Sequence, residues 1–468
     1  MTATTDASVQ EGAEAREEGV LGPRHRAATL GIVLVVTLLA FESMAVSTVM
    51  PVVTRDLDGL ALYAWGFSAT LIASLPATVL GGGWVDRSGP ARPLLAGLGT
   101  FVAGLAAAGA APAMWLFVAG RAVQGVGTGI AMVSVYVLIA RVYPERLRPR
   151  VFAALSAAWV LPSLLGPALG GLAAERLGWR WVFLGLIPLV VPPTLMLVPA
   201  MRGLRRTGPA RERARGASRR YLAAVAAAVG AAALLYGLDH PGWAVLPVAL
   251  AGLAGLVTGL PRLLPPGTLL MRRGLPSVVL VRGLLSGAFF GMDVFIPLAL
   301  TSLHGFSPTQ AGAVLTVAAL GWSAASQYQG RSRRPQAFFV RLGAVLVTAG
   351  IAASVLALQL TGWPAAVTWI IGGAGMGFAI GSLSVLMLRL SPEDEQGANS
   401  SALQIADTLG SSLVVGVAGA LVTAFGTDRL APGLGVAGAV FAAIAGIGAV
   451  AALRLESRQE SHRNGASA

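Results

Sequence analysis

The chain alternates between long apolar runs and short polar segments that hold most of its charges. The first run covers residues 27–53, whereas a membrane-spanning helix needs only about 20 mainly apolar residues. Thirteen further runs follow, so the pattern predicts fourteen membrane-spanning helices. The predicted spans are residues 27–53, 64–84, 92–111, 113–141, 150–175, 180–201, 220–239, 243–263, 275–302, 310–328, 338–360, 363–389, 397–425 and 433–454. The weakest are 220–239 and 243–263, and twelve spans remain if these two lie on the membrane surface.

The predicted spans fall into two groups of six, separated by a basic segment and an extra pair of spans. This order predicts an all-α polytopic membrane protein made of two six-helix bundles and two additional helices. The predicted division is a disordered cytoplasmic tail (1–26), a first bundle (27–201), a basic cytoplasmic loop (202–219), two extra transmembrane helices (220–263), a cytoplasmic linker (264–274), a second bundle (275–455) and a cytoplasmic tail (456–468).

Arginine is distributed unequally between the two sides of the predicted membrane region. All 34 basic residues are arginine: 28 lie on the side that carries both tails, four lie on the other, and two are inside spans. Cytoplasmic loops carry an excess of basic residues, so both termini are predicted to be cytoplasmic. The basic loop 202–219 is expected to contact anionic lipid. Because it contains no aromatic residues for base stacking, no nucleic-acid partner is expected.

Composition argues against several classes of function. The chain is 55% hydrophobic and only 12% charged, whereas soluble domains carry about 25% charged residues. It has no cysteine, which excludes disulfides, thiolate metal sites and cysteine catalysis. No HExxH, GxSxG or Walker spacing occurs, so neither an enzyme nor a metal site is expected. The glycine clusters that begin at Gly125 and Gly373 lie inside apolar spans, where we interpret them as close-packing positions.

A carboxylate lies in the middle of the first span. Glu42 is ~22 Å into this helix at ~1.5 Å per residue, and an unpaired charge at that depth costs about 3 kcal/mol or more. Arg121 in the span 113–141 is the best candidate partner, and Gln124 follows it by one turn. Burial disfavours the charged carboxylate and a nearby arginine favours it, so opposing effects allow proton exchange. Two interpretations stay open for Glu42 and Arg121: proton coupling, or a static ion pair.

The second bundle also carries charges inside its spans. Arg282 and Asp293 are eleven residues apart, so at ~100° per residue they lie on nearly the same helix face. Asp407 lies in the span 397–425. Asp293 is interpreted either as a functional residue that lines a cavity or as the structural partner of Arg282 or another arginine. For Asp407 both a functional and a structural role stay open.

Two short motifs of the first bundle combine glycine with charged residues or proline. The loop after the second predicted span is predicted to form a tight turn in which an Asp–Arg pair holds two helix ends together. Its motif residues are Gly82, Asp86, Arg87, Gly89 and Arg92, interpreted as conformational rather than substrate-binding. The fifth span contains Gly166, Pro167, Gly170 and Gly171, which allow helices to approach and bend.

These motifs resemble those of the major facilitator superfamily. The loop around Asp86 resembles its motif A, the segment with Arg121 resembles motif B, and the Gly-Pro element resembles motif C, the antiporter motif. The segment from Glu42 to Pro51 is similar to the first-helix motif of drug exporters. With fourteen predicted spans, the resemblance is to the fourteen-helix drug:proton antiporters. The second bundle departs from it, because residues 329–334 contain no acid where the first bundle has Asp86.

This resemblance implies a secondary active exporter that moves small apolar or cationic compounds by alternating access. It implies a proton gradient as the energy source and no cofactor. The alternative is an uptake symporter or facilitator of a small metabolite. The expected partners are the substrate, protons and membrane lipid, with the protein acting as a monomer in a bacterial inner membrane.

Overall fold

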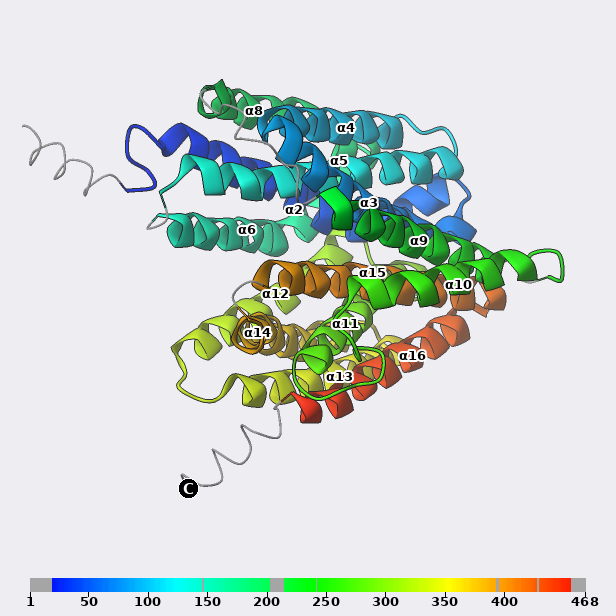
Figure 1. Cartoon of the computed structure of the whole chain (residues 1–468). Coiled ribbons are helices and arrows are strands. Elements are labelled where there is room, and N and C mark those ends of the chain that lie inside the picture. Colours follow the sequence, from blue (N-terminus) through cyan, green and yellow to red (C-terminus); the bar gives the residue numbers. More distant parts are fainter. Residues whose placement is uncertain are drawn as a thin grey trace, which may run out of the picture.

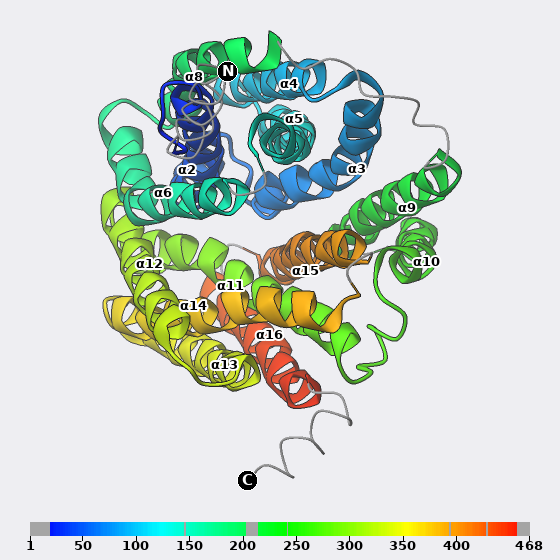
Figure 2. The same ribbon diagram turned by 60° about the vertical axis from the view of Figure 1, so that its left-hand side comes forward.

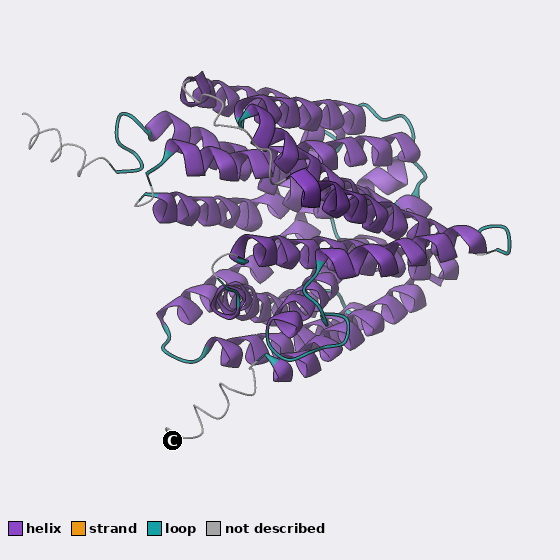
Figure 3. Cartoon of the chain, in the orientation of Figure 1, coloured by secondary structure: helices purple, strands orange, loops and turns teal. Residues whose placement is uncertain are grey.

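The computed structural model describes residues 19–144, 147–202, 214–240, 242–392, 395–426 and 429–455. These residues form helices joined by short loops and turns (Figure 3). The helices are α2 (Arg26–Asp56), η1 (Leu60–Leu62), α3 (Trp65–Ser88), α4 (Ala91–Gly109), α5 (Met114–Val142), α6 (Arg148–Arg176), α7 (Arg180–Leu184), α8 (Leu186–Arg202), α9 (Ala214–Asp239), α10 (Leu246–Leu263), α11 (Leu275–Leu303), α12 (Pro308–Arg331), α13 (Gln336–Leu360), α14 (Pro364–Leu390), α15 (Gln396–Phe425), α16 (Leu430–Ala451) and η3 (Ala452–Arg454).

The all-α architecture agrees with the sequence-based prediction. In the described part of the chain, twelve helices are long and apolar enough to cross a membrane, and α9 and α10 are among them. Helices α6 and α12 are not among these twelve, although they are 29 and 24 residues long. The total of fourteen spans therefore stays a prediction, and the chain is a multi-pass helical membrane protein.

The helices form two bundles that face each other, α2–α8 and α11–α16 (Figure 1). In Figure 2, α5 is seen end-on at the centre of the first bundle, with α2, α3, α4, α6 and α8 around it. Helices α9 and α10 pack against each other, and α9 lies beside α3 and α15, one helix from each bundle (Figure 2). They run alongside the bundles rather than across their ends, which argues against their lying on the membrane surface.

The two glycine clusters pack in the same way in each bundle. The cluster of α5 consists of Gly125, Gly127 and Gly129, and that of α14 of Gly373, Gly375 and Gly377. A side chain added to the first or third glycine of α5 would collide with the backbone of α3, and one added to the middle glycine with α4. In α14 the corresponding neighbours are α12 and α13. These contacts confirm that the clusters are packing positions and relate the two bundles by an internal repeat.

The predicted disordered tail is wrong for its last residues. Residues 1–18 lie outside the described residues, but residues 19–25 form turns before α2. The ring of His25 stacks on Tyr143 with 5.2 Å between centroids, and the Thr29 hydroxyl donates to the carbonyl oxygen of Val20 at 2.6 Å. Aromatic stacking and a hydrogen bond therefore order this short segment. Residues 203–213 of the basic loop and the tail from 456 onward lie outside the described residues.

Candidate functional site

Glu42, Arg121 and Gln124 form one buried cluster between α2 and α5. The Arg121 guanidinium donates to a carboxylate oxygen of Glu42, and the two side chains are 4% and 5% exposed. The Gln124 amide donates to the same oxygen at 3.2 Å and accepts from Arg121 at 3.0 Å. The predicted pairing of Glu42 with Arg121 is confirmed by this contact. Whether the pair is static or exchanges a proton stays open at this point.

Helix α3 holds Arg121 in this orientation. The Arg121 Nε donates to the carbonyl oxygen of Gly66 at 2.8 Å, in the first turn of α3. In return, the Thr70 hydroxyl donates to the carbonyl oxygen of Arg121 at 3.0 Å. Close approach of α3 and α5 is possible because Gly125 has no side chain to separate them. The guanidinium is thus fixed by three partners on three elements, which makes the cluster a rigid constellation.

A second charge pair connects α11 with α15. The Nε of Arg282 donates to a carboxylate oxygen of Asp407 at 2.8 Å, and the side chains are 14% and 17% exposed. The Ser286 hydroxyl donates to the same oxygen. Asp407 is therefore the partner of Arg282, and the alternative in which Arg282 pairs with Asp293 is wrong. The arginine reaches a neighbouring helix rather than a residue three turns away on its own helix.

Asp293 has a different environment from the other two carboxylates. It is half-buried on α11, and the indole N–H of Trp369 on α14 donates to it at 3.1 Å. Trp369 is fully buried and stacks on Phe289 with 4.6 Å between ring centroids. Sequence analysis did not single out Trp369 or Ser286. Trp369 could be found from its position in the internal repeat. Ser286 could be found because it lies on the same face of α11 as Arg282.

The antiporter-motif glycines of α6 contact both bundles. A side chain at Gly166 or Gly170 would press on Met44 or Ala45 of α2, next to Glu42. A side chain at Gly171 would meet the backbone of Pro308, at the start of α12 in the other bundle. This motif therefore lies between the buried charge cluster and the interface of the two bundles, so the packing interpretation agrees with the contacts.

Motif A lies at the junction of α3 and α4. Gly89 ends α3 with a φ of +79°, a backbone conformation that favours glycine, and its N–H donates to the carbonyl oxygen of Val85 at 2.8 Å. Gly82 is half-buried, and Arg87 and Arg92 are exposed on either side of the turn. The side chain of Asp86 lies outside the described residues. The predicted tight turn is confirmed, and a switching role for the loop stays a prediction.

The two bundles touch at the end of the molecule that carries few arginines. The Tyr63 hydroxyl donates to the carbonyl oxygen of Val294 at 2.6 Å, and the Ser68 hydroxyl donates to that of Ser412 at 3.1 Å. On the α6 side, the N–H of Thr309 donates to the Glu175 carboxylate at 2.8 Å. We call this end the arginine-poor end. All three hydrogen bonds connect one bundle to the other and close this end.

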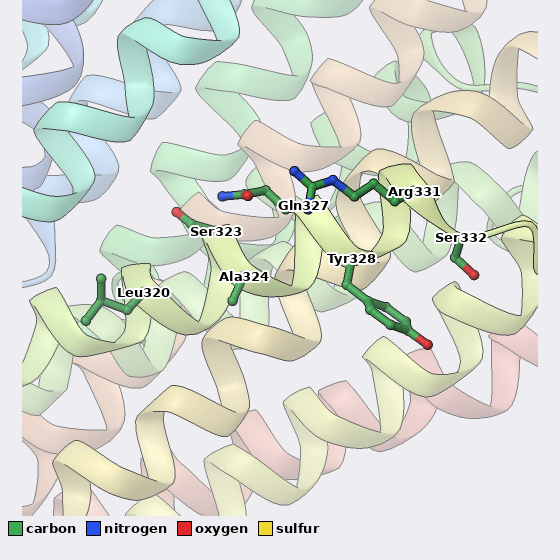
Figure 4. Close-up of a pocket in the computed structure, with 7 residues that line it drawn as sticks. All are labelled: Leu320, Ser323, Ala324, Gln327, Tyr328, Arg331 and Ser332. Carbon is green, nitrogen blue, oxygen red and sulfur yellow. The ribbon is translucent and has the colours of Figure 1, made fainter.

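A cavity of about 580 Å³ lies toward the opposite end of α12. It is lined by Leu320, Ser323, Ala324, Gln327, Tyr328, Arg331 and Ser332 (Figure 4). In Figure 4, Gln327 and Arg331 point to one side of α12 and Tyr328 points to the other. The first turn of the same helix forms the closed interface with α6. Helix α12 therefore runs from the closed end to this cavity, toward the arginine-rich end.

Comparison with known proteins identifies the class. The sequence matches the Major Facilitator Superfamily over residues 32–415, so the chain belongs to this family. It is a membrane transporter and not an enzyme. A probable multidrug-efflux transporter of Mycobacterium tuberculosis (strain CDC 1551 / Oshkosh) is 29% identical over 456 residues, which are 92% of this chain and 93% of the relative. The multidrug transporter protein MdtP of Bacillus subtilis (strain 168) is 25% identical over 426 residues, 86% of this chain and 77% of the relative.

Solved transporter structures share the fold. A POT family transporter in complex with 5-aminolevulinic acid has a TM-score of 0.68 at 14% identity, covering 94% of this chain and 99% of that chain. An inward-facing, unoccupied bacterial homologue of the human lysosomal transporter Spinster has a TM-score of 0.64 at 15% identity, covering 92% of this chain and 96% of that chain. At these identities the likeness establishes the fold alone.

Proposed function

We propose that this protein is a proton-coupled exporter of small apolar or cationic compounds that works by alternating access in a bacterial inner membrane. The observation that carries the proposal is the buried cluster of Glu42, Arg121 and Gln124, at mid-depth in the first bundle. The names of two relatives, both multidrug transporters, support export of drug-like compounds. The antiporter motif next to Glu42 supports exchange rather than uptake.

Protonation of Glu42 must be coupled to helix movement. Both side chains of the Glu42–Arg121 pair are nearly inaccessible, and a buried charge that loses its partner costs about 3–5 kcal/mol. A proton on Glu42 would leave the Arg121 charge uncompensated. Helix α2 must then move relative to α5 so that Arg121 meets water or another acceptor. This coupling gives the protein a way to convert proton binding into a change of conformation.

Helix α6 is positioned to transmit that movement. It contacts α2 through Gly166 and Gly170 and contacts α12 through Gly171. A shift of α2 would therefore act through α6 on the interface between the bundles. Because no side chains separate these helices at the glycines, they are closely packed, and a movement of α2 would displace α6 and then α12.

The arrangement of contacts fits the state that takes up substrate from the cytoplasm. The positive-inside rule assigns the arginine-rich end to the cytoplasm. The bundles are joined at the arginine-poor end, and the cavity along α12 lies toward the arginine-rich end. Export then requires the three interbundle hydrogen bonds to break, so that the bundles separate at the arginine-poor end.

The decisive experiment compares Glu42→Gln with wild type in proteoliposomes loaded with a cationic dye. We expect Glu42→Gln to lose dye transport driven by an imposed pH gradient but to retain dye-for-dye counterflow, which needs no net proton movement. Asp58→Asn is the matched control, because Asp58 is an exposed carboxylate in the loop after α2. It should behave like wild type in both assays.

The direction of proton movement separates export from uptake. In antiport, dye and protons cross in opposite directions, so dye addition to purified wild-type protein should release protons and Glu42→Gln should release none. Co-directional movement of dye and protons would support the symport alternative and reject the proposal. A Glu42→Gln variant with full proton-driven transport would assign the pair a static role.

A further inference from the structure

The internal repeat places a polar donor at matching positions of the two bundles. Arg121 lies four residues before Gly125, the first glycine of the α5 cluster. Trp369 lies four residues before Gly373, the first glycine of the α14 cluster. Because both clusters pack in the same way on their neighbours, the side chains of Arg121 and Trp369 leave equivalent helices at equivalent levels.

Each donor reaches a carboxylate on the first helix of its own bundle. Arg121 donates to Glu42 on α2, and Trp369 donates to Asp293 on α11 at 3.1 Å. The two pairs differ in charge. A guanidinium neutralises a carboxylate, whereas an indole N–H supplies one hydrogen bond and no charge. The second bundle thus repeats the carboxylate but not the cation.

The arginine of α11 does not neutralise Asp293 either. Arg282 is bound to Asp407, and it lies eleven residues from Asp293, or ~16 Å along the helix. Among the described residues, Asp293 forms no ion pair. A carboxylate kept within the membrane without a compensating charge is costly, which makes a cation supplied from outside the chain its natural complement.

Further aromatic side chains lie around the Phe289–Trp369 stack that donates to Asp293. Phe290, one turn before Asp293 on the same face of α11, and Trp322 on α12 are both half-buried, with 6.5 Å between their ring centroids. Phe289 stacks on Trp369 and holds its indole toward Asp293. Aromatic rings attract cations through their negative faces, most strongly where water is excluded.

We propose that Asp293, with Phe290 and Trp322, binds the positive group of an organic cation carried by this transporter. The inference rests on the proposed function in so far as the ligand is a transported compound. Asp293 immediately precedes Val294, whose carbonyl oxygen accepts the interbundle hydrogen bond of Tyr63. A cation bound there lies directly beneath the contact that must break for release at the arginine-poor end.

The first test measures equilibrium binding to purified protein without any proton gradient. The probes are tetraphenylphosphonium, a permanent cation, and triphenylphosphine oxide, which is neutral. Asp293→Asn should weaken tetraphenylphosphonium binding by about thirtyfold or more, because removal of one partner of a desolvated charge pair has an effect of that size. Binding of triphenylphosphine oxide should change less than about threefold, since it makes no charge interaction. Unchanged tetraphenylphosphonium affinity in Asp293→Asn, or equal losses for both probes, overturns the proposal.

The second test rebuilds the first bundle's pair in the second. Trp369→Arg places a guanidinium where it should neutralise Asp293, so tetraphenylphosphonium binding should fall about as far as in Asp293→Asn. Trp369→Phe is the control, because it removes the hydrogen bond without adding a charge, and it should keep most of the affinity. Because Trp369 is fully buried, binding of triphenylphosphine oxide reports whether each variant still folds around it. If Trp369→Arg folds and still binds the cation as wild type does, the proposal is wrong.

Glu42→Gln separates this inference from the proposed function. It should lose proton-driven transport while its tetraphenylphosphonium binding still depends on Asp293, so that adding Asp293→Asn weakens that binding in the Glu42→Gln background as well. If wild-type protein binds tetraphenylphosphonium through Asp293 but shows no proton exchange, the cation site stands and the coupling proposal fails. If Asp293→Asn loses proton coupling and keeps its affinity for tetraphenylphosphonium, Asp293 carries protons and not the substrate.

Discussion

The hydroxyl of Tyr63 in the first bundle donates to the carbonyl oxygen of Val294 in the second, at 2.6 Å. Tyr63 is 2% exposed, and its ring lies 5.5 Å from that of Phe295. Because the backbone of Val294 is part of α11, the bond ties a side chain of one bundle to the rigid helix of the other. It is one of three hydrogen bonds that close the arginine-poor end.

Tyr63→Phe should shift the protein toward conformations that are open at this end. The substitution keeps the ring and removes a hydrogen bond worth about 1 kcal/mol, which corresponds to about a fivefold change in the conformational equilibrium. The chain has no cysteine, so Ser412→Cys provides a single reporter thiol at the closed contact. A membrane-impermeant maleimide added from the arginine-poor side should label it about five times faster in Tyr63→Phe.

Tyr143→Phe is the control for this experiment. Tyr143 also makes a buried hydroxyl contact, at 2.7 Å to Thr29, but both residues belong to the first bundle. Its loss should leave labelling of the Ser412→Cys reporter unchanged. Equal labelling rates in Tyr63→Phe and the parent protein would mean that the bond does not contribute to closure.

Helix α9 contacts both bundles at the seam between them. The Trp65 indole of α3 donates to the Asp239 carboxylate at the end of α9. On the other side, Leu235 of α9 covers Gly416 of α15 so closely that a side chain at Gly416 would collide with it. Since α3 and α15 must separate when the arginine-poor end opens, α9 must leave one of them. The polar contact favours α3, so we expect α9 to move with the first bundle.

A disulfide between Leu235→Cys and Gly416→Cys should therefore block transport, and dithiothreitol should restore it. The matched control is a disulfide between Gly237→Cys and Ala249→Cys, which joins α9 to α10 at a similarly close contact. This second cross-link stays within the extra pair and should leave transport intact. Normal transport with the Leu235–Gly416 link formed would show that α9 moves with α15 instead.

Hydrophobicity predicted the helices well because burial in lipid requires long apolar runs, whatever the tertiary packing. It also led to the Glu42–Arg121 pair, since few charges occur inside the spans of the first bundle and each needs a partner. The partner of Arg282 was missed for a definite reason. Helical periodicity finds residues that share a face of one helix, whereas Asp407 is 125 residues away on α15.

The environment of Asp293 was only partly predictable. Its place inside a span was evident from the sequence, but its donor Trp369 is an aromatic residue among many in apolar spans. Only the packing of the two glycine clusters aligns Trp369 with Arg121. Interbundle contacts such as Tyr63 with Val294 depend on how the two bundles meet, which local patterns do not encode.

The Arg282–Asp407 pair offers a direct measure of how strongly burial strengthens a charge contact. Asp407→Asn should destabilise the protein by about 1.5–3 kcal/mol, because it removes a charged hydrogen-bond acceptor at 2.8 Å from a half-buried arginine. Adding Arg282→Gln should cost little more, since the arginine no longer needs a partner.

The Arg180–Asp56 pair has the same 2.8 Å distance but side chains 43% and 47% exposed. Its coupling energy should stay below about 1 kcal/mol. Double-mutant cycles on thermal unfolding of the purified protein measure both couplings. Equal coupling in the two pairs would contradict the role assigned to burial.

The same double variant, Arg282→Gln/Asp407→Asn, also tests whether the pair takes part in transport. If it retains proton-driven transport, the Arg282–Asp407 pair is structural. If it folds but loses that transport, Asp407 lies on the proton path.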